Sequence, residues 1–283
     1  MALNAVQIAG KNLENRLTIT NSGELAVSDY WVDDAIRRTF ADYGDTVSVF
    51  KKSESLLKFG ENDTLGTSSE TVWMTGGNET YPTTNAIDKF SSSSGADTQS
   101  IIVEGNTIDG SGNFTFVKQT VTLQGQTEAA LTTPLARANR VYNNGATNFA
   151  GTVYVYEDDT VTAGVPQTAA KIHLTADAEG NQSEKGATTI SNTDYWFVSH
   201  IYCALNEKTA ATVDVRFEVR EKGKVFRVRA TLTCSSAGGA SFVDLRPFII
   251  VPKNADFRFT ASASTTNVSV EAWANGSLAQ VVT

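Results

Sequence analysis

The sequence has little material for metal or redox chemistry, with two cysteines and two histidines in 283 residues. Cys203 and Cys234 are too few for a disulfide framework, so we expect two buried thiols. Neither His173 nor His200 has a second histidine or cysteine at zinc-like spacing, because His200 and Cys203 would lie on opposite faces of one strand. The sequence therefore predicts neither a zinc site nor a disulfide scaffold.

Charge is scarce as well, and its balance is negative. Charged residues make up 19% of the chain, against roughly 25% in an average soluble domain. The formal net charge of −8 provides no basic footprint for displacing the counterions of a nucleic acid, and it disfavours anionic membrane surfaces. We therefore expect no nucleic-acid partner and no membrane partner.

Long hydrophobic runs and targeting signals are missing too. The longest aliphatic and aromatic run, Phe248 to Val251, is far shorter than the ~20 residues of a membrane-spanning helix. Residues 1–7 have neither the charged start nor the apolar core of a signal peptide. These absences predict a protein that is made in the cytoplasm and does not span a bilayer.

The motifs of common catalytic sites are also absent. The sequence contains no G-x-S-x-G nucleophile elbow and no glycine-rich phosphate loop. Glu157-Asp158-Asp159 offers hard oxygen ligands, but it lacks the residue spacing of a calcium loop. We therefore expect no catalytic residue, no metal and no cofactor, and a protein that is not an enzyme.

Threonine, serine and asparagine are abundant, at 36, 23 and 19 residues. This blend, together with valine and glycine, favours strands and turns. Alternation of period two predicts eight strands in the last part of the chain, near residues 151–156, 171–174, 195–205, 211–220, 225–234, 241–250, 256–263 and 267–274. The predicted fold is therefore mainly β, an antiparallel β-sandwich of jelly-roll type.

One predicted hairpin carries the main concentration of positive charge. Placing Lys222-Gly223 at the centre of its turn pairs Val219 with Phe226 and Phe217 with Val228. Its basic residues alternate with apolar ones and are Arg216, Arg220, Lys222, Lys224, Arg227 and Arg229. A solvated or intersubunit sheet face accounts for this cluster more economically than phosphate binding does.

The first 60 residues add a hairpin and one helix. After a short hairpin over residues 16–27, apolar residues at helical spacing predict an amphipathic helix over about residues 29–43, with Ser28 as N-cap. The apolar stripe of this helix, which we hypothesise to be an assembly interface, consists of Trp31, Val32, Ile36, Phe40 and Tyr43. A hairpin and one helix cannot bury such a stripe alone, so it must cover either the chain's own sandwich or a partner.

These patterns divide the chain into three segments. Residues 1–60 hold the N-terminal hairpin and helix, an assembly segment. Residues 61–150 form a β-rich region with long loops, and residues 151–283 form the eight-stranded β-sandwich.

Several short, distinctive motifs lie between residues 57 and 142. They are Leu57-Lys58-Phe59-Gly60-Glu61-Asn62, Val72-Trp73, Gly76-Gly77, Tyr81-Pro82, Val121-Thr122-Leu123-Gln124-Gly125 and Arg137-Ala138-Asn139-Arg140-Val141-Tyr142. A K-F-G-x-N stretch followed by V-W-x-x-G-G and a Y-P segment resembles a group of virion structural proteins of tailed bacteriophages, many of them marine. The resemblance covers about residues 47–275 and leaves out the first 46.

The resemblance implies a non-enzymatic structural protein of the virion that is assembled in the cytoplasm of the host bacterium. The first hypothesis is a capsid decoration or cement protein, or a capsid fibre. Such a protein is expected to be a homo-oligomer whose partners are other virion proteins, among them the major capsid protein. The alternatives are a tail or head–tail junction component, and a carbohydrate-binding β-sandwich used for host attachment.

Overall fold

The computed structural model describes residues 17–19, 25–27, 50–205 and 211–281. The chain forms two compact units, Met1–Val49 with Val282–Thr283, and Phe50–Val281. In the first unit, β1 (Leu17–Ile19) and β2 (Leu25–Val27) pair antiparallel, as the sequence predicts. The predicted helix over residues 29–43, with its stripe, lies outside the described residues, so its assembly role stays a prediction.

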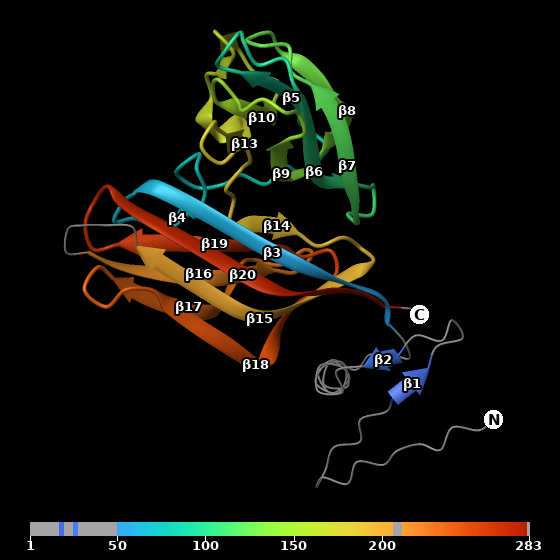
Figure 1. The fold of residues 1–283 in the computed structure, drawn as a ribbon, viewed down its shortest axis with the longest axis vertical. Coiled ribbons are helices and arrows are strands. Elements are labelled where there is room, and N and C mark those ends of the chain that lie inside the picture. The colour runs from blue at the N-terminus through green and yellow to red at the C-terminus, as the bar shows by residue number, and fades with distance from the viewer. Residues whose placement is uncertain (1–16, 20–24, 28–49, 206–210, 282–283) are drawn as a thin grey trace, which may run out of the picture. The chain divides into compact units, whose positions relative to one another are not determined.

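The second unit is built almost entirely of strands (Figure 1), which confirms the mainly β prediction. Its elements in chain order are β3 (Phe50–Leu65), β4 (Glu70–Thr71), β5 (Ile87–Ser92), β6 (Ser100–Ile108), β7 (Phe114–Thr122), β8 (Ala129–Leu135), β9 (Arg137–Asn143), β10 (Val153–Glu157), β11 (Val161–Thr162), β12 (Val165–Pro166), the 3₁₀ helix η1 (Ala169–Lys171), β13 (Ile172–Ala176), β14 (Ala187–Thr189), β15 (Asp194–Leu205), β16 (Thr212–Arg220), β17 (Arg227–Ser235), β18 (Ser241–Val251), β19 (Asp256–Ala263) and β20 (Val268–Val281).

Two sheets make up an antiparallel sandwich. One has the strand order β18-β15-β20-β3, and the other has the order β14-β19-β16-β17, with β4 also on β19. The pairing is nested along the chain: β3 pairs with β20, β4 and β14 pair with β19, β15 pairs with β18, and β16 pairs with β17. This nesting of early strands with late ones is the connectivity of a jelly roll.

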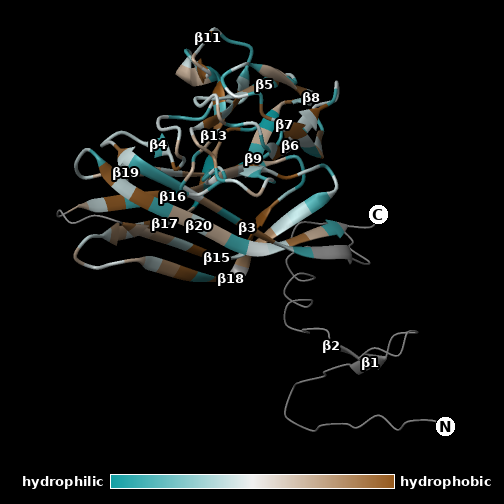
Figure 2. Cartoon of the chain, turned by 45° about the horizontal axis from the view of Figure 1, so that its top comes forward, coloured by the Kyte–Doolittle hydropathy of each residue, from teal (hydrophilic) through white to brown (hydrophobic). Residues whose placement is uncertain are grey.

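The sandwich core lies between these two sheets and is rich in aromatic side chains. Trp196 from β15 meets Phe257 from β19 with ring centroids 5.1 Å apart, and Phe217 from β16 packs on Phe257 at 4.6 Å. All three side chains are fully buried. Hydrophobic residues alternate with polar ones along the strands, as Figure 2 shows, so each strand turns one face to this core.

One sandwich strand is interrupted by an insertion. On β19, Thr260 pairs with Thr71 of β4 and Arg258 pairs with Ala187 of β14, so β4 and β14 are two pieces of one strand position. The chain leaves the sandwich at Trp73 and re-enters it at Lys185, and these two residues form an isolated antiparallel β-bridge. Residues 73–185 are therefore a second β region inserted within a single strand of the jelly roll.

The insertion has its own sheets and its own core. Its two larger sheets have the strand orders β13-β10-β5-β8 and β7-β6-β9, and β11 pairs with β12 in a small hairpin. Between the larger sheets lie fully buried aliphatic residues such as Ile101, Val103 and Val155. The insertion is thus a second layered β structure carried by the sandwich (Figure 1).

The strand positions expected from sequence are found, but their grouping differs. Two of the eight strands expected in the sandwich, β10 and β13, pair with each other in the insertion, and β10 also pairs with β5. Their places in the jelly roll are taken by β3 and by the split strand β4 and β14. Alternation marks a strand but carries no information about its partner, which explains the error.

The predicted register of the β16–β17 hairpin was also wrong. A β-bulge between Phe217 and Glu218 puts Phe217 opposite Ala230 and Val219 opposite Arg227. Phe226 therefore does not face Val219. Its ring packs instead on that of Tyr81, with centroids 5.2 Å apart. The hairpin connection is therefore longer than the two-residue turn that the prediction assumed.

Candidate functional site

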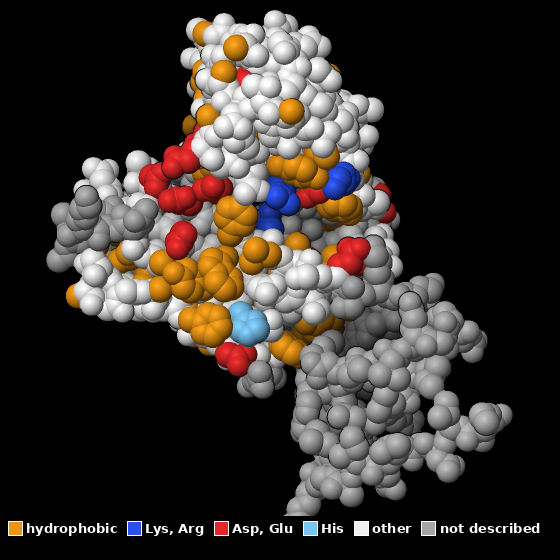
Figure 3. Space-filling view, viewed as in Figure 1, with side chains coloured by type: hydrophobic (Ala, Val, Ile, Leu, Met, Phe, Trp, Pro, Cys, Tyr) orange, Lys and Arg blue, Asp and Glu red, His pale blue; other side chains and the backbone are white. Residues whose placement is uncertain are grey.

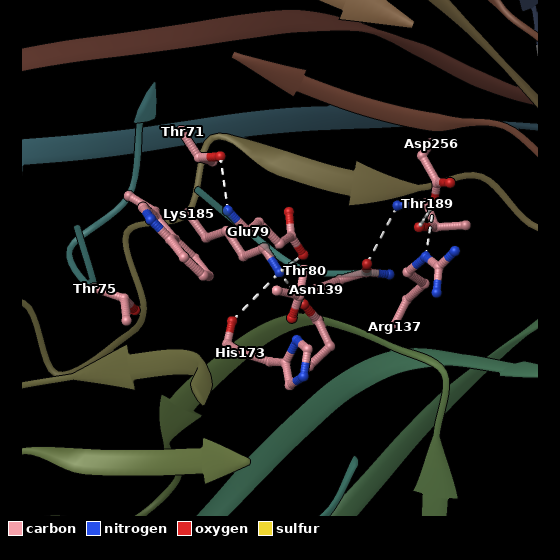
Figure 4. A network of polar contacts seen from close by, with 12 residues as sticks. Thr71, Thr75, Glu79, Thr80, Arg137, Asn139, His173, Lys185, Thr189 and Asp256 are labelled. Atoms are coloured by element: carbon pink, nitrogen blue, oxygen red, sulfur yellow. Dashed lines mark hydrogen bonds and ion pairs between the residues drawn. The ribbon is translucent and has the colours of Figure 1, made fainter. Parts of the chain in front are cut away.

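The first candidate feature is a buried polar junction between the insertion and the sandwich (Figure 4). Asp256 of β19 accepts a hydrogen bond from Arg137 Nε of β9 at 2.9 Å and one from Arg220 Nε of β16 at 2.9 Å. Thr189 Oγ1 donates a third, at 2.6 Å. Burial alone would raise the pKa of Asp256, but the charges of Arg137 and Arg220 outweigh it and hold this pKa below its usual 3.8.

A second buried ion pair joins Lys185, at the end of the insertion, to Glu79. The Lys185 ammonium also donates to the carbonyl oxygen of Ala138 at 2.8 Å and lies 5.5 Å from the centre of the Trp73 ring. Burial lowers the pKa of Lys185, while the Glu79 carboxylate opposes that shift. These contacts join the two ends of the insertion, at Trp73 and Lys185, to each other and to β9; we call the result a clamped insertion.

β3 contributes a third buried cation from the sandwich side. Lys58 Nζ donates to the Asn139 carbonyl oxygen of β9 at 2.6 Å. Burial, together with the nearby charges of Lys185 and Arg140, lowers the pKa of Lys58 to about 7. The neighbouring Gly60 has no room for a side chain, since a Cβ there would lie 2.1 Å from the backbone nitrogen of Gly186.

An aromatic group completes the junction. The Tyr81 ring lies 4.2 Å from the Arg220 guanidinium carbon and 5.1 Å from that of Arg137. Phe226, at the β16–β17 connection, lies under Arg220 at 4.6 Å and under Arg258 at 4.0 Å. Arginine planes and aromatic rings therefore alternate along this edge of the sandwich.

The motifs that carry the phage resemblance gather at this junction. Lys58 and Gly60 come from K-F-G-x-N, Trp73 from the V-W segment, Tyr81 from Y-P, and Arg137 from the segment that ends at Tyr142. Buried ion pairs add little net stability, but removing one partner costs about 3–5 kcal/mol. The arrangement therefore holds the insertion in one orientation on the sandwich.

The second candidate feature is the outer face of the sheet β18-β15-β20-β3. Cross-strand neighbours form an aromatic row that runs through all four strands and consists of Phe59, Trp273, Tyr202 and Phe242. The rings of Tyr202 and Trp273 stack with centroids 4.9 Å apart. Figure 3 shows apolar side chains gathered over these strands, with a histidine and acidic side chains beside them.

An open groove of about 420 Å³ lies at one end of the aromatic row. Phe59, Trp273 and Leu57 supply its apolar lining, and its polar lining comes from Glu61, Glu184, Glu271 and Asn275. Burial, a hydrogen bond with Glu184 and the charge of Asp63 raise the pKa of Glu61 to about 8. We call this feature the acidic groove, because carboxyl groups dominate its polar wall.

His200 and the two cysteines lie where the strand pattern places them. His200 is on the outer face, with Nδ1 2.8 Å from Ser199 Oγ and Nε2 3.5 Å from Asp244. Cys203 points into the sandwich core, and Cys234 lies in the same core as a second free, buried thiol. Both thiols are thus buried, as the strand pattern predicts.

The acidic run 157–159 is occupied by protein partners. Glu157 lies 3.0 Å from His173 Nε2, and Asp159 accepts hydrogen bonds from Thr168 N at 2.6 Å and Thr168 Oγ1 at 2.9 Å. Lys171 pairs with Asp159 at 3.5 Å. Across the described part of the chain, no group of three or more His, Cys, Asp or Glu side chains is placed to hold a metal ion. Nor does that part contain a helix long and apolar enough to cross a membrane.

Sequence reasoning missed the aromatic row and the acidic groove. The four tryptophans are scattered along the chain, so no aromatic platform was predicted from Trp273. The row depends on a β-bulge in β15 between Val198 and His200, which changes the alignment of β15 with both neighbours. Alternation along β3, β15 and β20 shows which residues share a face of each strand. It predicts the aromatic row only once the register between the strands is known.

Comparisons with known proteins give no family. No protein-family model matches the sequence, and no curated protein matches it. A structure of the Gt strain of infectious bursal disease virus is 9% identical, with 88% of this chain and 82% of that chain covered and a TM-score of 0.19. The exported protein XepA of PBSX is 12% identical, with 93% and 99% covered and a TM-score of 0.18. TM-scores this low carry no argument about fold or function.

Proposed function

We propose that this protein is a non-enzymatic structural component of a tailed-phage virion, placed on the capsid surface as a decoration or cement protein or as a capsid fibre. The observation that carries the proposal is the split jelly roll with a clamped insertion. The sandwich can pack against neighbours while the insertion is held away from its core in one orientation. A two-part rigid subunit of this kind suits a protein that covers a shell.

Two further observations support the proposal. Several residues of the motifs that resemble phage virion proteins, among them Lys58, Trp73 and Arg137, lie in the junction, so the resemblance includes the part that defines the architecture. The outer sheet face also leaves large apolar side chains exposed, among them Leu57 at 54% and Phe242 at 55%. Exposed apolar patches on a β-sheet are typical of surfaces that another protein covers.

The test is localisation on purified particles. An antibody raised against the purified chain should label phage heads in immunoelectron microscopy, with labelling spread over the shell. Label confined to the tail or to the head–tail junction would favour that alternative instead. Particles that carry no label at all would contradict a virion role.

A further inference from the structure

Exposed apolar side chains are concentrated on two separate surfaces. In the described residues, the large hydrophobic side chains that remain exposed are Leu57, Phe116, Val225, Val228, Phe242 and Val243. Leu57 and Phe242 lie on the outer face that carries the aromatic row, whereas Val243 pairs with the buried Ile201 and lies on the other face of β18. Val225 and Val228 lie on the β16–β17 hairpin, where they are 71% and 50% exposed. Four of these six residues thus belong to two places.

The first surface, the acidic groove, holds the negative charges of Glu184 and Glu271 without compensation. Glu61, Glu184 and Glu271 line it, and its lining contains no lysine or arginine. Within the described residues, Glu184 and Glu271 form no ion pair, and the raised pKa of Glu61 reflects burial and crowding by neighbouring carboxyl groups. A cation placed in the groove would relieve this repulsion, and the Trp273 and Phe59 rings would favour it further.

The second surface, which we name the basic hairpin, carries the complementary charge. Three of its basic residues have partners inside the molecule: Arg220 binds Asp256, Lys222 donates to Asn113, and Arg229 pairs with Glu221. The remaining three, Arg216, Lys224 and Arg227, are exposed and form no ion pair with any described residue. These cations flank the exposed valines of the same hairpin.

The two surfaces cannot meet within one copy of the chain. The basic hairpin belongs to the sheet β14-β19-β16-β17, whereas the acidic groove lies on the outer face of the opposite sheet. The packed aromatic core separates them. Contact between them therefore requires two copies, and it is heterologous, because different surfaces meet and the pair keeps one groove and one hairpin free. Such contacts continue from copy to copy and produce rings or extended arrays.

We propose that the acidic groove of one copy receives the basic hairpin of a second copy. In this contact Lys224 and Arg227 would face Glu184 and Glu271, and Val225 and Val228 would cover Leu57 and the aromatic row. The inference rests on the proposed virion role for its biological setting, since a repeating contact between copies suits a shell-covering protein. Its test uses the purified chain alone, so either proposal can fail without the other.

The experiment is a charge swap read by sedimentation velocity. The wild-type chain should associate in a concentration-dependent way below about 0.1 mM, and added salt should weaken the association. Glu184→Lys with Glu271→Lys, or Lys224→Glu with Arg227→Glu, should each weaken it at least about tenfold, because like charges then face each other. Mixing the two double variants should restore association, since each supplies the surface that the other needs.

Controls separate charge pairing from misfolding and from total charge. Glu179→Lys and Lys253→Glu change exposed charges elsewhere and should leave association unchanged. Circular dichroism and thermal melting should show every variant folded; if Glu184→Lys is not, Glu184→Gln with Glu271→Gln should still weaken association. A wild-type chain that stays monomeric would overturn the proposal, as would variants that fail to complement each other when mixed. Binding of a neutral oligosaccharide in the groove, detected through Trp273 fluorescence, would also overturn the proposal if raising the protein concentration did not weaken that binding.

Discussion

The sandwich and the insertion are both antiparallel β structures with a core of their own, yet they are held together differently. The sandwich has long strands, with 16 residues in β3, 14 in β20 and 12 in β15. In the insertion, the strands of the two larger sheets have five to nine residues. Short strands leave more backbone groups in loops, and those groups need other hydrogen-bond partners.

Polar side chains provide these partners in the insertion. Asp97, only 1% exposed, accepts hydrogen bonds from Ala150 N at 2.7 Å and Gly151 N at 3.1 Å, and from the Ser92 hydroxyl. Asn181 binds Phe149 N in the same way, at 3.0 Å. The comparison teaches that strand ladders and aromatic packing stabilise the sandwich, whereas the insertion also depends on individual side chains that bind loop backbone.

The largest effect is expected in the sandwich core. Phe257→Ala removes a fully buried ring that contacts Trp196, Phe217 and Phe259, so it should cost about 3–5 kcal/mol of unfolding free energy. Chemical denaturation followed by circular dichroism measures the loss. Phe116→Ala, at a ring that is 50% exposed, is the control and should cost less than about 1 kcal/mol. Equal losses would contradict the assignment of the core.

The junction should be nearly as sensitive. Glu79→Gln leaves the Lys185 ammonium buried without its counter-charge and should cost about 3 kcal/mol or more. Because the junction links the two regions, limited proteolysis should then release fragments within residues 73–185 before the sandwich is cut. Replacing both partners, Glu79→Leu with Lys185→Met, should cost less than Glu79→Gln alone. The opposite ranking would argue against a clamped insertion.

A smaller loss is expected from the loop contacts of the insertion. Asp97→Ala removes the acceptor for the amides of Ala150 and Gly151, so it should cost about 1–3 kcal/mol. Hydrogen exchange should speed up at these two amides and leave the sandwich amides protected. The partly exposed Asp177, which accepts a hydrogen bond from the amide of Glu179, provides a milder comparison. Uniform exchange across the whole chain would show that the two regions are not distinct in this respect.

The insertion should also respond to acid. Burial and the charges of Lys185 and Arg137 lower the pKa of His173 to about 3, so this ring stays neutral in the folded chain. The unfolded chain binds a proton below about pH 6.5, and the folded chain does not until about pH 3, so stability is lost as the pH falls through this window. His173→Gln should flatten that part of the stability profile. An unchanged acid limb would contradict the neutral, buried ring.

The smallest effect is expected on the outer sheet face, because Glu61 is only partly buried and solvent screens its charge, and it has the opposite sign. The pKa of Glu61 is raised from 4.5 to about 8, so the folded chain holds a proton that the unfolded chain has already lost. Stability should therefore decrease as the pH rises from about 4.5 to about 8. Glu61→Gln should remove this slope, measured by melting temperature against pH. A slope that survives the substitution would place its origin elsewhere.

Local pattern alone located most of the strands. Alternation predicted strands near 195–205, 211–220 and 256–263, and the structure has them at Asp194–Leu205, Thr212–Arg220 and Asp256–Ala263. The turn between β6 and β7 is local in the same way, because Asp109 accepts hydrogen bonds from the amides of Ser111 and Asn113. Such features depend on side-chain period and turn chemistry, which neighbouring residues determine among themselves.

Partner choice was decided by the tertiary structure. β4 and β14 are far apart in sequence and individually too short to be recognised, and they become one strand position only because β19 pairs with both. The aromatic row likewise exists because a bulge in β15 aligns Tyr202 with Trp273 and Phe242. The sequence by itself determined the mainly β class, the burial of the two cysteines and the positions of most strands. Only long-range pairing, whose register no local pattern encodes, decided the split strand, the clamped insertion and the composition of the outer face.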